Sequence, residues 1–89
     1  MNNRGKILWV DDEIQHLKPH ILFLKEKGYE IFKANNGQDA ISLAKSNIFD
    51  LVLLDQSMPG MDGLETLVEL KKLRQNQIII MITKTEDEW

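Results

Sequence analysis

The 89-residue chain contains no cysteine, which excludes a disulfide framework, a thiolate nucleophile and a zinc site with cysteine ligands. It also lacks any apolar run approaching the ~18 residues that a membrane-spanning helix needs. The first six residues lead directly into a strand-like stretch, without the apolar region of a signal peptide. We therefore expect a cytoplasmic protein that does not contact a membrane.

Basic residues are also fewer than acidic ones. Lysine and arginine number 11 against 14 aspartates and glutamates, which gives a formal net charge of −3. Binding to the phosphates of a nucleic acid requires a basic surface, so we expect no nucleic-acid partner for this chain. Its length allows one small domain, and a composition with 43% hydrophobic and 28% charged residues is typical of a globular protein.

Apolar runs of strand length alternate with helical patterns along the chain. Strands are predicted at residues 7–10, 29–34, 51–54 and 78–82, with 29–34 the weaker, partly alternating strand that suits a sheet edge. Helices are predicted at residues 13–28, 37–46 and 62–73. This βαβαβαβ order predicts an α/β fold, a doubly wound parallel sheet with helices on both faces.

The helix termini carry recognisable signals. Gly28 is suited to end the first helix, and Pro19 inside that helix predicts a kink or bend. Asp12 with Gln15, and Asp62 with Glu65, each have the spacing of a capping box. The turn at residues 35–37 supplies the N-cap of the second helix.

Acidic and hydroxyl side chains follow three of the predicted strands. Asp11 and Asp12 come after the first, Asp55 after the third and Thr83 after the fourth. In a parallel sheet these strand ends share one edge, where ligands usually bind. Two carboxylates ~4 Å apart repel by about 4 kcal/mol at an effective dielectric constant of 20, so a cluster of three requires protons or a cation. Oxygen ligands of this kind suit Mg²⁺, and an aspartate beside it can accept a phosphoryl group.

Each of these residues also has a structural interpretation. Asp12 can be a helix cap, Asp55 a residue of the turn that leads to Pro59 and Gly60, and Thr83 a turn residue. The functional interpretation rests on their coincidence at the ends of apolar strands at regular intervals. His16 and His20 lie four residues apart on a predicted helix, but no carboxylate or cysteine is placed to complete a metal site with them.

Together these motifs resemble the receiver domain of a two-component response regulator over essentially the whole chain. The matching segments are residues 7–13, residues 51–63 and residues 80–83. The resemblance implies a flavodoxin-like receiver fold with strand order 2-1-3-4-5. Residues 17–24 and 81–84 are similar, more narrowly, to PorX-type regulators, in which a receiver precedes a phosphatase-like effector domain.

The resemblance also implies a role for each site residue. Asp55 would be the phosphoacceptor for a sensor histidine kinase, and Asp11 and Asp12 would join it in holding Mg²⁺. The backbone carbonyl of Ser57 would complete the protein ligands, and Thr83 would be the switch hydroxyl. Such a domain is not an enzyme beyond self-phosphorylation and autodephosphorylation.

The chain departs from the family pattern at its C-terminal end. Residues 1–89 are expected to form a receiver domain lacking the fifth βα unit, which in the family carries the active-site lysine; Lys84 does not match that lysine. The exposed apolar edge at residues 78–82 then predicts a homodimer or higher assembly, formed through that edge or by exchange of elements. The alternative function is a phosphorylation-independent dimerisation or interaction module. An aspartyl phosphohydrolase is disfavoured because Ser57 stands where that class has a second acid.

Overall fold

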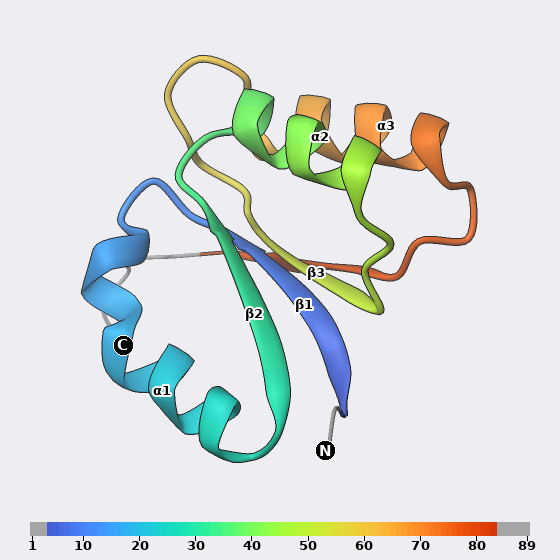
Figure 1. Cartoon of the computed structure of the whole chain (residues 1–89). Helices are drawn as coiled ribbons and strands as arrows, with labels where there is room; N and C mark the ends of the chain where they lie inside the picture. Colours follow the sequence, from blue (N-terminus) through green and yellow to red (C-terminus); the bar gives the residue numbers. More distant parts are fainter. Residues whose placement is uncertain (1–3, 84–89) are drawn as a thin grey trace.

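The computed structural model describes residues 4–83 and contains one four-stranded parallel sheet (Figure 1). The strand order is β2-β1-β3-β4, which confirms the predicted doubly wound α/β architecture and the edge position of β2. The strands are β1 (Gly5–Val10), β2 (Tyr29–Ala34), β3 (Leu51–Asp55) and β4 (Ile79–Ile82). The helices are the 3₁₀ helix η1 (Ile14–Leu17), α1 (Lys18–Glu26), α2 (Gly37–Ser46) and α3 (Gly63–Leu73). None of these helices is long and apolar enough to cross a membrane.

The sheet buries side chains on both faces, which explains why its central strands are continuous apolar runs. Helices α2 and α3 lie side by side on one face and α1 lies on the other (Figure 1). Along β1, Leu8 and Val10 enter the core beneath α2 and α3, whereas Ile7 and Trp9 enter the core beneath α1. Because side chains of a strand alternate between faces, one apolar run supplies both cores.

The region of residues 13–28 differs from its predicted form. The apolar spacing predicts one continuous helix with a bend at Pro19, but the structure has the short helix η1 followed by α1, and Pro19 lies in the first turn of α1. A proline there interrupts no hydrogen bond, since the first N–H groups of a helix have no partner within it. The interruption therefore falls at the junction of η1 and α1, just before Pro19, and does not come from a hydrogen bond that Pro19 removes. Gly28 does follow the end of α1 with a positive φ of 103°.

Two of the three predicted N-terminal caps are present. The Asn36 side chain accepts a hydrogen bond from the Asp39 N–H at 2.8 Å and caps α2. Asp62 and Glu65 form the predicted capping box at the start of α3. The box predicted for Asp12 and Gln15 does not form, because η1 begins with Glu13 as its N-cap and without a side-chain cap.

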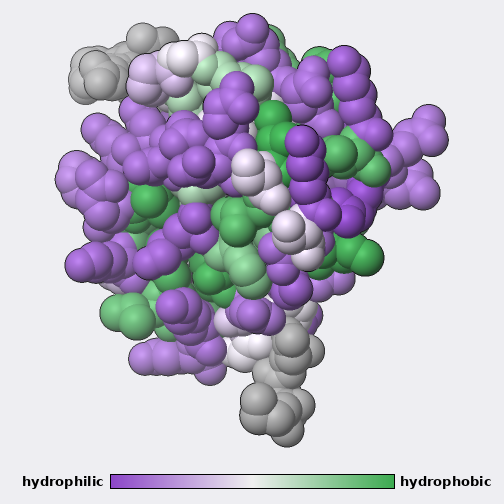
Figure 2. All heavy atoms as spheres, turned by 45° about the horizontal axis from the view of Figure 1, so that its top comes forward, coloured by the Kyte–Doolittle hydropathy of each residue, from purple (hydrophilic) through white to green (hydrophobic). Residues whose placement is uncertain are grey.

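Strand β4 lies at the other edge of the sheet and, within residues 4–83, pairs with β3 alone. Its residue Ile80 is 50% exposed, and Ile78 just before it is 61% exposed. Other apolar side chains are exposed singly or in small groups, and Figure 2 shows such patches among hydrophilic residues on the side of the molecule that α2 and α3 cover. Residues 85–89, whose sequence predicts the first turn of a further helix, lie outside the described residues.

Candidate metal centre at the carboxyl edge of the sheet

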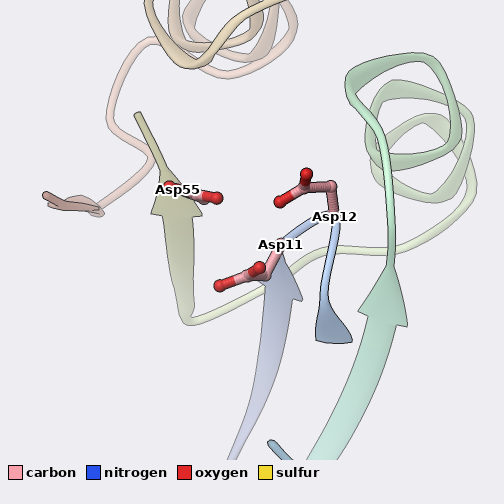
Figure 3. A group of neighbouring side chains, drawn as sticks. All are labelled: Asp11, Asp12 and Asp55. Carbon is pink, nitrogen blue, oxygen red and sulfur yellow. The ribbon is translucent and has the colours of Figure 1, made fainter. Parts of the chain in front are cut away.

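The pairing of β1 with β3 places three aspartates together. The two strands are parallel and in register from Ile7 opposite Leu51 to Val10 opposite Leu54, so Asp11 and Asp55 end the pair side by side. Asp12 follows at once, and the three carboxylates face a common space (Figure 3). One oxygen atom from each lies within 4.8 Å of the others. The sequence prediction that these residues meet at one edge is confirmed.

Hydrogen bonds from the backbone orient two of these carboxylates. Asp11 Oδ1 accepts from the N–H of Glu13 at 2.8 Å, and Asp55 Oδ1 accepts from the N–H of Ser57 at 3.2 Å. Asp11 and Asp55 are each 1% exposed, whereas Asp12 is only half-buried. The cluster thus has two buried carboxylates that accept backbone hydrogen bonds and a third that is partly open to water.

The chemistry of this donor set fits a hard divalent cation. Ionised carboxylates 4.8 Å apart repel by roughly 3 kcal/mol at an effective dielectric constant of 20, and burial of two of them reduces screening by water. A bound cation removes that repulsion. Mg²⁺ binds to a small number of carboxylates and keeps several water ligands, for which the half-buried Asp12 leaves access. The site therefore suits Mg²⁺ better than zinc or copper. Within residues 4–83 this is the one group of three potential metal ligands, and the exposed His16 and His20 do not join it.

Close packing at Gly63 fixes the backbone that carries Asp55. The Gly63 N–H donates to the carbonyl of Gln56 at 3.0 Å, which brings the start of α3 against the end of β3. A Cβ atom at Gly63 would lie 2.5 Å from the carbonyl oxygen of Asp55 and 2.7 Å from Cα of Gln56, so only glycine fits. A glycine at this position is typical of a turn, and no sequence pattern signals this contact.

Thr83 lies at the same edge, one residue beyond the last pair of β3 and β4. Asp55 is opposite Ile82 in that pair, and the N–H of Gln56 donates to the carbonyl of Ile82 at 3.0 Å. The hydroxyl of Thr83 donates to Oε1 of Gln56, also at 3.0 Å. No sequence pattern points to a role for Gln56. Ser57, the next residue in the chain, is exposed. Lys84 lies outside the described residues.

Residues 7–89 match the family model described as response regulator receiver domain. The chain belongs to this family. The receiver domain is 37% identical over 83 residues to the transcriptional regulatory protein SrrA of Staphylococcus aureus, a match that covers 93% of this chain and 34% of SrrA. It therefore spans about a third of the length of the curated relatives it matches.

Solved structures similar to this receiver domain include complexes with magnesium. One is the response regulator TrrA of Thermotoga maritima in complex with Mg²⁺-BeF, with 41% identity, a TM-score of 0.81 and coverage of 91% of this chain and 70% of TrrA. Another is a chain of the CheX–CheY–BeF₃–Mg²⁺ complex of Borrelia burgdorferi, with 30% identity, a TM-score of 0.81 and coverage of 93% and 64%. These similarities confirm the predicted flavodoxin-like receiver fold.

Proposed function

We propose that this receiver domain accepts a phosphoryl group on Asp55 from a sensor histidine kinase. The observation that carries the proposal is the convergence of Asp11, Asp12 and Asp55 within 4.8 Å at the ends of β1 and β3. In this proposal the three carboxylates and the backbone carbonyl of Ser57 hold Mg²⁺. The magnesium-containing complexes of TrrA and of the Borrelia proteins support the assignment of the metal.

The proposed reaction transfers a phosphoryl group from nitrogen to oxygen. A carboxylate oxygen of Asp55 forms a bond to phosphorus while the bond from phosphorus to the kinase imidazole nitrogen breaks, and the nitrogen keeps the electron pair of that bond. When bound, Mg²⁺ supplies positive charge that offsets the repulsion between the carboxylate and the phosphoryl oxygens. The N–H of Ser57 holds Oδ1 of Asp55, which limits rotation of the nucleophile. The product is an acyl phosphate.

The domain acts in this proposal as a phosphoacceptor in a signalling pathway and catalyses at most its own phosphorylation and dephosphorylation. SrrA is a transcriptional regulatory protein, and most of its length lies outside the matched region. This supports an effector domain in a longer protein as a further partner. A second copy of the chain, paired through the edge of β4, is the third proposed partner. The narrower similarity to PorX-type regulators stays a prediction.

Intact-mass spectrometry after incubation with acetyl phosphate and Mg²⁺ tests the proposed acceptor. We expect the chain to gain one phosphoryl group, and the Asp55→Asn variant to gain none because it lacks the nucleophilic carboxylate. Asp50→Asn is the matched control, because Asp50 lies just before the opposite end of β3 and should leave the reaction intact.

Two results would contradict the acceptor role. One is a phosphoryl group that Asp55→Asn still gains, which would locate the acceptor elsewhere. The other is a wild-type chain that binds Mg²⁺ and remains unmodified, which would favour a phosphorylation-independent interaction module. Magnesium binding is measured separately, from chemical-shift changes at residues 11, 12 and 55.

A further inference from the structure

A side-chain hydrogen bond ties the residue after Asp55 to the residue after β4. Thr83 Oγ1 donates to Gln56 Oε1 at 3.0 Å, although the two residues are 27 positions apart in the chain. The adjacent backbone bond from the Gln56 N–H to the Ile82 carbonyl, at 3.0 Å, holds the two segments side by side. The bond therefore links the two segments one residue beyond the last β3–β4 pair, next to the proposed phosphoacceptor.

The Thr83 hydroxyl cannot donate to Gln56 and to a phosphoryl group on Asp55 at the same time. A threonine hydroxyl has one proton to donate. While that proton is donated to Oε1 of Gln56, it is not available to an oxygen of a phosphoryl group on Asp55. Donation to the phosphoryl group therefore requires the bond to Gln56 to break.

The exposure of both side chains makes the bond easy to open. Gln56 and Thr83 are both exposed, so when the bond breaks each side chain can form a hydrogen bond with water instead. Losing a hydrogen bond costs most free energy when it leaves a buried polar group without a partner. Breaking the bond between Thr83 and Gln56 leaves no such group. A contact of this kind can bias an equilibrium between two arrangements without locking either.

We propose that Gln56 is a positioning residue that holds the Thr83 hydroxyl while Asp55 is unphosphorylated and so opposes the phosphorylated arrangement. This inference rests on the proposed function of Asp55 and takes Thr83 as the hydroxyl that donates to the phosphoryl group, the role that the family resemblance implies. Because coupling between two events is reciprocal, a contact that must break when a phosphoryl group binds lowers the affinity for that group. Loss of an exposed hydrogen bond of ordinary strength should raise the affinity by about two- to fivefold.

Binding of beryllofluoride in the presence of Mg²⁺ measures this coupling, because BeF₃⁻ occupies the position of a phosphoryl group on a carboxylate. NMR titrations compare the full 89-residue chain with Gln56→Met, Thr83→Val and the double variant. Methionine keeps the length of glutamine without its acceptor, and valine keeps the shape of threonine without its hydroxyl. We expect Gln56→Met to tighten binding two- to fivefold in the wild-type background and to change nothing in the Thr83→Val background.

The titrations separate failure of this inference from failure of the proposed function. Wild-type chain that binds no beryllofluoride overturns the phosphoacceptor function and, with it, any coupling to Gln56. Wild-type binding with no gain in Gln56→Met, or an equal gain in both backgrounds, overturns the role of Gln56 alone.

A second measurement tests the contact without any ligand. Three-bond couplings of the Thr83 side chain report whether it occupies one χ1 rotamer. We expect one rotamer to be more populated in the wild-type chain than in Gln56→Met. Identical couplings in the wild-type chain and in Gln56→Met would overturn the inference, whatever the acidic cluster binds.

Discussion

Asp12 is the residue of the acidic cluster whose charge can be removed with the least structural disturbance. Asp11 and Asp55 accept hydrogen bonds from the backbone, whereas the half-buried carboxylate of Asp12 makes none to the described residues. In EDTA, Asp12→Asn should raise the free energy of unfolding by about 1 kcal/mol, because it relieves repulsion from the other two carboxylates. With Mg²⁺ at roughly ten times its Kd, wild-type chain should gain about 1.4 kcal/mol and the variant less.

Urea unfolding in EDTA and in Mg²⁺ checks this prediction, with Glu30→Gln as the control. That substitution removes the same charge from an exposed side chain of β2, so it should leave the response to Mg²⁺ unchanged. The proposed metal centre would be refuted by an Asp12→Asn variant that gains as much stability from Mg²⁺ as wild-type chain does.

The capping box at the start of α3 is an element-scale feature with a measurable contribution. Asp62 Oδ1 accepts from the Glu65 N–H at 2.9 Å, and Glu65 Oε1 accepts from the Asp62 N–H at 3.0 Å. Asp62→Ala should lower the free energy of unfolding by about 1 kcal/mol, because a helix N–H loses its acceptor. Urea denaturation measures the loss.

Glu69→Ala serves as the control within the same helix. Glu69 forms an exposed ion pair with Lys72 at 3.3 Å, a type of contact worth only ~0.3 kcal/mol. If Asp62→Ala is no more destabilising than Glu69→Ala, the capping box contributes nothing measurable to α3.

The elements that sequence reasoning located well are those specified by local patterns. Continuous apolar runs identified β1 and β3, and capping residues identified the starts of α2 and α3. The pattern failed between residues 13 and 18, because apolar residues spaced three and four apart fit both a 3₁₀ helix and an α-helix. In the site, Asp11, Asp12 and Asp55 were predictable from strand ends. The Gln56 contact depends on the pairing of β3 with β4, and the Gly63 contact on the packing of α3, which no local pattern encodes.

At the scale of the whole molecule, the edge of β4 predicts association with a second copy. The four residues of β4, Ile79–Ile82, carry no charge, and Ile80 is 50% exposed. Natural edge strands usually carry charge or are covered, and two copies of β4 can pair antiparallel about a two-fold axis.

We expect light scattering at tens of micromolar to give a homodimer. Ile80→Lys should shift the chain to monomer, whereas Ile48→Lys, at a 70% exposed position before β3, should leave the dimer intact. A folded wild-type monomer at that concentration would contradict the prediction, and dissociation by both variants would place the interface away from β4.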